Sequence, residues 1–327
     1  MTRKLGEFEI IKTYFSPLSR SEKGAFNLTD DAAVIEIPDG KSMVVTTDTL
    51  VEGVHFLSED LPENIAKKLL RVSLSDLAAM GSVPAYYNLS IATKLGTTSD
   101  WFKAFAEGLL ADQIEFGVTL IGGDTVVTSG PLTLSLTAMG FVKKGKAISR
   151  SGAKLGDDIW VSGLIGDAAL GLMAAKGKLI SISEENKNYL ISRYTQPIPQ
   201  ILLGPKLSGH VNSAIDVSDG LIGDLDHICE TSKLGANIQI TDIPISRAAS
   251  IIVTEKPHYL DLILSGGDDF ELLFTADKSF RAVAKSLIKT LGVNLTKIGV
   301  MVSRRSIEIF DENGNKYFIQ NNGYTHF

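Results

Sequence analysis

The chain of 327 residues has a net charge of −6, with 44% hydrophobic and 21% charged residues. This length favours two domains over a single core, and the composition is that of an ordinary globular protein. The excess of carboxylates and the lack of a basic stripe disfavour a nucleic-acid partner. No apolar run reaches the roughly eighteen residues of a membrane span, and residues 1–7 lack an apolar segment, so we expect a cytoplasmic protein without a membrane anchor.

The first elements place two carboxylates near each other. A helix over 6–15 and a polar loop precede Asp31, and a strand is expected over 32–37. A second strand follows and stays apolar until it reaches Thr46. We predict that this strand ends there and that Asp48 lies at its opening, close to Asp31. The glycine-rich turn between the two strands is not a P-loop, because that motif requires another glycine where the first strand ends.

The next helix is predicted over 62–81, from a proline in its first turn to a glycine at its end. Its apolar stripe contains Leu69 and Val72 and continues at Asp76. A carboxylate on a buried stripe is costly unless it is paired or bound to a metal, so Asp76 is a candidate metal ligand. The alternative is that Ser73 or a main-chain amide satisfies Asp76 inside the protein.

A helix over 100–116 then leads into a strand that ends in Gly122-Gly123-Asp124. Paired glycines allow close approach to a phosphate, and the following carboxylate can hold the cation that bridges it. Tight turns use the same residues, so this motif alone is weak evidence. A strand over 132–142 completes the first half.

A cationic stretch over 143–154 marks the boundary between an N-terminal domain, 1–148, and a C-terminal domain, 149–327. Arg150 stands between two serines in this stretch, a setting suited to a bidentate phosphate contact. The alternative is a solvated connector.

In the second half, a strand over 214–217 carries Asp216 and runs into Ser218, before a helix over 221–231. Asp216 and Asp219 can point the same way, and the N-terminus of the helix favours an anion. The alternative is a helix cap, which would explain Ser218 and Asp219 but not Asp216. We interpret three further polar residues of this helix as solvated surface: Asp224, Asp226 and His227.

The single cysteine, Cys229, excludes an intramolecular disulfide and fits a reducing compartment. It shares a helical spacing with Leu225, so we interpret it as a core residue and not as a nucleophile. Further along, Gly266-Gly267-Asp268-Asp269 repeats the pattern of two glycines before an acid, and a hairpin is expected at 311–314. Near the end, Tyr324 either anchors the terminus to the core or stacks on a ligand.

Six aspartates thus lie at predicted element ends or on a buried stripe: Asp31, Asp48, Asp76, Asp124, Asp216 and Asp219. Like charges gathered in one place repel, so we expect bound divalent cations. Oxygen ligands without accompanying Cys or His pairs favour Mg²⁺ over Zn²⁺, and Mg²⁺ usually accompanies phosphates. The sequence therefore predicts nucleotide-dependent phosphoryl transfer.

The motifs together resemble the thiamine-monophosphate kinase family, of the aminoimidazole ribonucleotide synthetase-like ATP-binding superfamily. The resemblance spans the whole chain, with its motifs in order. They are Thr47-Asp48-Thr49-Leu50-Val51-Glu52-Gly53-Val54-His55-Phe56, Leu74-Ser75-Asp76-Leu77-Ala78-Ala79-Met80-Gly81, Gly122-Gly123-Asp124-Thr125, Arg150-Ser151-Gly152-Ala153, Ile215-Asp216-Val217-Ser218-Asp219-Gly220-Leu221 and Ser265-Gly266-Gly267-Asp268-Asp269.

The resemblance implies an α/β (α+β) fold of two domains, with an N-terminal sheet that pairs across a homodimer and a C-terminal mixed sheet with helices. It implies ATP-dependent phosphorylation of thiamine monophosphate to thiamine diphosphate, the last step in making that cofactor. The transfer would be direct and in line, without a phospho-enzyme.

The resemblance also implies roles for individual residues. The Mg²⁺ ligands would be Asp31, Thr46, Thr47, Asp48, Asp76, Asp124, Asp216 and Asp219. The ATP contacts would be Gly123, Asp124, Arg150 and Ser218, and the thiamine monophosphate contacts would be His55, Asp268 and Tyr324. Within these sets, the residues central to catalysis would be Asp48, Asp124, Arg150 and Asp216.

Two positions depart from the family pattern. Thr29 stands where the family commonly has glycine before its two aspartates, which questions a close backbone approach there. Asp268 stands where the family has glutamate, so its shorter side chain would reach the substrate through water or be replaced by Asp269.

Three rivals remain. Selenophosphate synthetase would need an N-terminal Cys or selenocysteine, and aminoimidazole ribonucleotide synthetase should lack both the Val51–Phe56 run and the terminal Gly-Tyr-x-His-Phe pattern. A binding protein without turnover would not need a full set of metal ligands.

Overall fold

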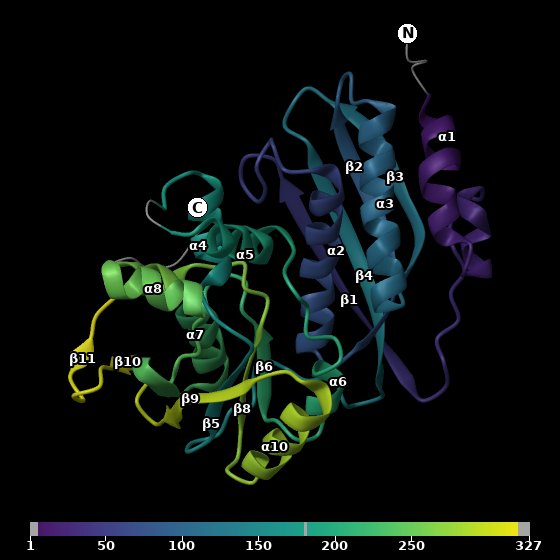
Figure 1. The fold of residues 1–327 in the computed structure, drawn as a ribbon. Coiled ribbons are helices and arrows are strands. Elements are labelled where there is room, and N and C mark those ends of the chain that lie inside the picture. The colour runs from purple at the N-terminus through teal and green to yellow at the C-terminus, as the bar shows by residue number, and fades with distance from the viewer. Residues whose placement is uncertain (1–5, 180–181, 320–327) are drawn as a thin grey trace. The chain divides into compact units, whose positions relative to one another are not determined.

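The structure is a computed structural model that describes residues 6–179 and 182–319. The chain divides into two compact units (Figure 1). The first ends at Leu77 and resumes over Ser82–Gly145, and the second takes Ala78–Gly81 and the chain from Lys146 onward. The sequence suggested one boundary, between residues 148 and 149, and no exchange of a short segment between the units.

The first unit contains a short N-terminal helical region, two long helices and four strands. These elements are α1 (Glu7–Ile10), η1 (Ile11–Phe15), η2 (Ser16–Ser19), η3 (Lys23–Leu28), β1 (Lys41–Val51), α2 (Pro62–Ala79), β2 (Val83–Lys94), α3 (Ser99–Phe116), β3 (Thr119–Thr128) and β4 (Thr133–Lys143).

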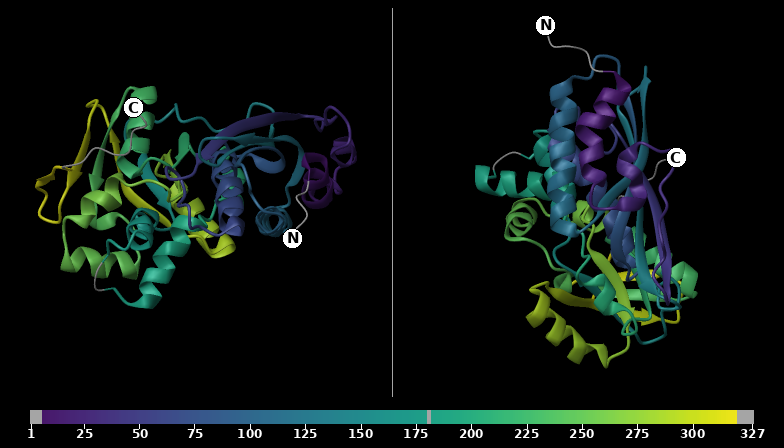
Figure 2. Two further views of the ribbon diagram at one scale, coloured as in Figure 1. Left: turned by 90° about the horizontal axis from the view of Figure 1, so that it is seen from above. Right: turned by 90° about the vertical axis from the view of Figure 1, so that its right-hand side faces the viewer.

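The four strands form one sheet in the order β1-β4-β2-β3, in which only β2 and β3 are parallel. Helices α2 and α3 cover one face of the sheet (Figures 1 and 2). They lie close together, because a Cβ on Gly108 of α3 would come within 2.5 Å of the Glu63 carbonyl of α2. Arg71 of α2 also forms a buried ion pair with Asp112 of α3, with an Nε–Oδ2 distance of 2.7 Å.

Three expectations about strands in this unit are wrong. β1 runs through Asp48 to Val51, and β3 runs through Asp124 to Thr128, because β4 and β2 pair with them along their length. The pairing satisfies the main-chain groups of β1 even through the four consecutive polar residues Thr46-Thr47-Asp48-Thr49. The segment 32–37 is not a strand, and β1, its expected neighbour, pairs with β4.

The second unit contains most of the helices and seven strands. Its elements are β5 (Asp158–Ser162), α4 (Asp167–Ala175), α5 (Glu184–Thr195), α6 (Gly204–Leu207), β6 (Ser213–Asp216), α7 (Leu221–Ser232), β7 (Gly235–Gln239), η4 (Ile240–Asp242), α8 (Arg247–Glu255), α9 (Tyr259–Ser265), β8 (Leu272–Ala276), α10 (Phe280–Leu291), β9 (Leu295–Val302), β10 (Ile307–Phe310) and β11 (Lys316–Tyr317).

The seven strands form a mixed sheet in the order β11-β10-β7-β9-β5-β8-β6, with β7 and β10 parallel. Alternate residues of β5 enter two different cores: Val161 packs with α7 and α9 residues, and Trp160 packs with Phe280 of α10. Both faces of this sheet are therefore buried, which explains the continuously apolar strands. The hairpin predicted at 311–314 joins β10 to β11.

Candidate functional site

The first group of predicted ligands meets between β1 and α2. Ser73 Oγ donates to Asp48 Oδ2 at 2.7 Å, and the Thr46 hydroxyl donates to Asp76 Oδ2. The helix predicted over 62–81 is observed as α2, which ends at Ala79. Asp76 follows the buried Leu69 and Val72 on its stripe but is itself half-buried. The sequence suggested Ser73 as a partner for Asp76, but the Ser73 hydroxyl donates its hydrogen bond to Asp48 instead.

Asp48 and Asp76 are close enough to repel each other. Burial and the charge of Asp76 raise the pKa of Asp48 from 3.8 to about 6, and the hydrogen bond from Ser73 opposes this only in part. A cation next to the two carboxylates would favour their ionised forms and remove this cost. Two carboxylates and a hydroxyl are the oxygen donors that Mg²⁺ prefers.

Thr47 does not join this group. Its Oγ1 lies 2.9 Å from Thr137 Oγ1, and Thr49, two residues further along the strand, pairs in the same way with Ser135 at 2.7 Å. Successive side chains of a strand point to opposite faces, so Thr47 projects from the face opposite Asp48.

The loop after β1 fixes the orientation of His55. The main-chain N–H of Val51 donates to His55 Nδ1 at 3.0 Å, so the neutral ring carries its proton on Nε2. The Lys68 ammonium donates to the His55 carbonyl at 2.9 Å. Glu52 forms an ion pair with Lys94 at 2.6 Å, and Phe56 is 1% exposed. Much of the Val51–Phe56 motif therefore builds the loop that presents His55.

A second group of predicted residues lines a cavity of about 460 Å³ in the first unit. Asp31, Gly123 and Asp124 contribute to its wall, together with apolar residues such as Phe15 and Leu120. The motif Gly122-Gly123 serves the sheet as well, because a Cβ on Gly123 would lie 1.9 Å from the Leu89 carbonyl oxygen.

The segment before Asp31 explains one departure from the family pattern. Thr29 has a φ of −112°, a conformation open to any residue, so the backbone does not require glycine at this position. The Thr29 hydroxyl donates to the Phe26 carbonyl at 2.7 Å and closes the preceding turn.

The sheet separates the two groups. Thr49 aligns through Ser135 and Ser90 with Asp124, so Asp124 shares the face of Thr49 and not that of Asp48. Three strand spacings lie between β1 and β3, which is about 14 Å. Within the described ranges of the chain, no three His, Cys, Asp or Glu side chains come together as a metal site. The predicted ligands on β1 and β3 therefore do not form a single cluster in the first unit.

In the second unit, two loops bring together Asp216, Ser218, Asp219 and Asp268. Asp216 ends β6 and is 5% exposed. The Asp268 N–H donates to the Ser218 carbonyl at 2.8 Å, and the Phe270 N–H donates to the Val217 carbonyl at 2.8 Å. These bonds fasten the loop after α9 to the turn before α7.

Sequence reasoning missed Asp224, which is buried and not solvated. Its Oδ2 accepts the N–H groups of Ser218 and Asp219, each at 3.0 Å. Burial and the charge of Asp219 raise the pKa of Asp224 to about 7. The available signal was its spacing, because Asp224 lies three residues after Leu221 on the buried stripe of the helix. Asp226 and His227 are exposed as expected.

Asp268 and Asp269 differ in role. Asp268 is half-buried with a φ of +71°, whereas Asp269 is 2% exposed. The Asp269 carboxylate accepts the N–H groups of Gly166 at 2.7 Å and Ala168 at 3.2 Å, and so caps α4. Burial raises the pKa of Asp269 well above its usual value. The suggestion that Asp269 replaces Asp268 at the substrate is therefore wrong.

Arg150 lies at the other end of α7. Its carbonyl accepts the Thr231 hydroxyl at 3.3 Å, whereas Ser218 precedes the first turn of the helix. The helical rise separates these ends by about 15 Å, so the backbones of Arg150 and Ser218 are not adjacent. The Arg150 side chain is exposed. Tyr324 lies outside the described residues.

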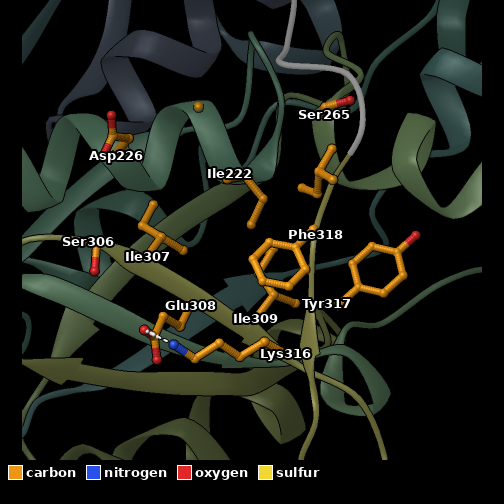
Figure 3. A pocket seen from close by; sticks show the side chains of 12 residues that line it. Ile222, Asp226, Ser265, Ser306, Ile307, Glu308, Ile309, Lys316, Tyr317 and Phe318 are labelled. Atoms are coloured by element: carbon orange, nitrogen blue, oxygen red, sulfur yellow. Dashed lines mark hydrogen bonds and ion pairs between the residues drawn. The ribbon is translucent and has the colours of Figure 1, made fainter.

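A further cavity of about 660 Å³ opens beside these loops (Figure 3). Ile222 and Ser265 line it, as do Ile307, Ile309 and Phe318. Its most prominent charges are already paired, because Lys316 Nζ lies 2.7 Å from Glu308 Oε1. None of the residues predicted for the site lines this cavity.

Two other expectations can be compared with the structure. Cys229 is buried as predicted, and burial raises the pKa of its thiol to about 12. Among the helices that the structure describes, none combines the length and apolar character needed to cross a bilayer.

The two units correspond to known domain families. Residues 29–142 match the N-terminal domain of AIR synthase related proteins, and residues 154–312 match their C-terminal domain. The fold and its acidic loops therefore define an AIR synthase-related protein.

More specific relatives narrow the class. The chain is 41% identical over 323 residues to the thiamine-monophosphate kinase of Escherichia coli (strain K12), covering 98% of each protein. This chain belongs to the thiamine-monophosphate kinase family. The resemblance inferred from the motifs is confirmed, and so is the two-domain fold that it implied.

Solved structures of thiamine-monophosphate kinases are also similar to this chain. The crystal structure of thiamine-monophosphate kinase from Stenotrophomonas maltophilia K279a superposes with a TM-score of 0.81 at 39% identity, covering 89% of this chain and 91% of that one. AaThiL complexed with AMPPCP and TMP superposes with a TM-score of 0.78 at 26% identity, covering all of both chains.

Proposed function

We propose that the protein transfers the γ-phosphoryl group of ATP to thiamine monophosphate, giving thiamine diphosphate and ADP. The observation that carries this proposal is the match along almost the whole chain to thiamine-monophosphate kinases. A related protein, AaThiL, was solved with AMPPCP, an ATP analogue, and TMP. The motifs quoted from the sequence are the acidic and glycine-rich segments that such a reaction needs.

Several Mg²⁺ ions fit the donor chemistry of the chain. Asp48, Asp76 and Thr46 supply oxygen donors at one place, where burial and the charge of Asp76 raise the pKa of Asp48. Asp31 and Asp124 supply donors at the cavity of the first unit, and Asp216 and Asp219 supply them on the turn before α7. We retain Thr47 as a further candidate ligand. When bound, Mg²⁺ neutralises phosphate charge and orients the transferred group.

The nucleotide contacts that we propose use main-chain and side-chain groups. Gly123 and Asp124 line the first unit's cavity, and Ser218 stands at the N-terminus of α7, where N–H groups favour a phosphate. Arg150 is exposed, and its guanidinium has no hydrogen bond or ion pair within the described part of the chain, so it is available to a phosphate.

For the acceptor substrate we propose contacts from His55, Asp268 and Tyr324. His55 offers Nε2–H as a donor, because its Nδ1 accepts the Val51 N–H. Asp48, Asp124, Arg150 and Asp216 would be the groups central to transfer, through positioning and charge, and no residue is assigned as a covalent nucleophile.

We further propose that the enzyme acts as a homodimer in the cytoplasm. β1 and β3 are the edge strands of the four-stranded sheet, and Val45 of β1 is 56% exposed on the face opposite α2. An exposed apolar residue on an unpaired edge favours pairing with a second copy. Light scattering on the purified protein tests the dimer, and a monomer at micromolar concentration would contradict it.

The decisive experiment measures ADP release with Mg²⁺-ATP, with and without thiamine monophosphate, and identifies the product by mass. We expect thiamine diphosphate only when both substrates are present. ADP release that ignores thiamine monophosphate would point to a different acceptor. No ADP under any condition would favour a binding protein without turnover.

A further inference from the structure

The turn before α7 is held by a carboxylate from inside the helix. Asp224 is 1% exposed, and its Oδ2 accepts the N–H groups of both Ser218 and Asp219 at 3.0 Å. A typical helix uses the side chain of its N-cap residue for this purpose. Here the N-cap is Gly220, which has no side chain to offer.

Gly220 cannot easily be replaced by a capping residue. Its φ is +114°, and a Cβ at this position would lie 2.6 Å from the main chain of Ser265. The neighbouring loop therefore occupies the space that a cap would need. Asp224, one turn further along, supplies the missing acceptor from the interior.

The same turn is also fixed from its other side. The Ser218 carbonyl accepts the Asp268 N–H at 2.8 Å, while the Ser218 N–H binds Asp224. Both main-chain groups of Ser218 are thus committed, which leaves its half-buried side chain and the exposed Asp219 side chain to meet a ligand. Small displacements of such groups are costly, since a misplacement of about 1 Å can lower a rate by roughly 100-fold.

We propose that Asp224 is a positioning residue, which binds no ligand itself but holds the Ser218–Gly220 turn so that Ser218 and Asp219 meet the Mg²⁺-nucleotide. The inference rests on the proposed function for the identity of that ligand. The hydrogen bonds that Asp224 accepts are observed in the structure and do not depend on the proposed function.

The first test is hydrogen–deuterium exchange of the ligand-free protein. Asp224→Ala removes the acceptor, so the amides of Ser218 and Asp219 should exchange at least about tenfold faster. Asp224→Asn should keep protection near that of the wild type, because the amide oxygen can accept the same two N–H groups. Glu230→Gln is the matched control, as Glu230 is an exposed acid on the same helix. Asp224→Leu, which keeps the volume without an acceptor, replaces Asp224→Ala if the latter does not fold.

The second test is calorimetric binding of AMPPCP with Mg²⁺, read together with kcat and KM. We expect Asp224→Ala to weaken analogue binding by about 10- to 100-fold, as for other residues that orient metal ligands, and Asp224→Asn to stay within about threefold of the wild type. Unchanged amide exchange in Asp224→Ala would overturn the inference, and so would lost protection with unchanged affinity. A wild-type protein that binds the analogue but does not phosphorylate thiamine monophosphate would overturn only the proposed acceptor.

Discussion

The carboxylates of the two units are stabilised in different ways. Asp48 and Asp76 in the first unit are half-buried and accept side-chain hydroxyls, from Ser73 and Thr46 respectively. Asp224 and Asp269 in the second unit each receive two main-chain N–H groups.

This difference separates two functions of one residue type. A hydroxyl satisfies one lone pair and leaves the remaining oxygens able to bind a cation. A carboxylate that accepts two main-chain N–H groups fixes the loop that contains them, so removing the carboxylate disturbs that loop. We therefore expect carboxylates of the first kind to matter for chemistry and those of the second kind for stability and loop geometry.

The largest expected effect is on turnover. Asp48→Ala should lower kcat/KM by about 1,000-fold or more, because it removes a metal ligand, while the melting temperature stays equal or rises as like-charge repulsion disappears. Steady-state kinetics and thermal unfolding measure both quantities. Thr49→Ala is the control, since Thr49 lies on the same strand and faces the opposite side. Activity of Asp48→Ala within tenfold of the wild type would refute the metal assignment.

Asp269→Ala should show the opposite pattern. It leaves the N–H groups of Gly166 and Ala168 without their buried acceptor, so unfolding should become easier by about 2–4 kcal/mol. Urea denaturation measures this change. The exposed Asp242 serves as the comparison, and Asp242→Ala should change stability by less than about 0.5 kcal/mol. Equal stability of the two variants would mean that the cap on α4 contributes nothing.

The pH dependence of stability sharpens the comparison further. The pKa of Asp48 is raised to about 6, above its ordinary 3.8, so its contribution to stability is fully present below pH 3.8 and is lost as the pH rises through 6. Asp48→Asn removes this loss. Without Mg²⁺, the stability of the variant relative to the wild type should therefore increase between pH 4 and pH 7.5, by up to about 3 kcal/mol.

Mg²⁺ provides the internal check on this result. It competes with the proton at Asp48, so it should raise the wild-type melting temperature more at pH 7.5 than at pH 5. If Mg²⁺ raises the melting temperature of Asp48→Asn as much as that of the wild type at both pH values, Asp48 is not a ligand.

The smallest expected effect concerns Gly123. Gly123→Ala places a methyl group 1.9 Å from the Leu89 carbonyl oxygen, so β2 and β3 must shift at a cost of about 1–3 kcal/mol. Gly6→Ala is the matched control, because nothing lies within 4 Å of that position. Calorimetric melting of both variants tests the packing role of Gly123. If Gly123→Ala is as stable as the wild type but no longer binds AMPPCP, the packing role is refuted and the proposed nucleotide contact is supported.

The family, the two-domain fold and the burial of Cys229 could all be predicted from the amino-acid sequence. Order and spacing of motifs carry this information, because a glycine pair before an acid or an acid on an apolar stripe can be recognised locally. The sequence also identified Asp76 as a carboxylate on an apolar stripe that needs a partner, and the structure supplies the Thr46 hydroxyl.

Which of these residues meet depends on contacts between segments that are far apart in the sequence. β1 and β3 continue past Asp48 and Asp124 because neighbouring strands satisfy their backbones, and that pairing is not visible in local composition. The face of Asp124 and the commitment of Asp224 and Asp269 to main-chain amides depend on register and on loops far apart in the sequence. A carboxylate has the same sequence signature whether it binds a cation or a backbone, and only its surroundings distinguish the two.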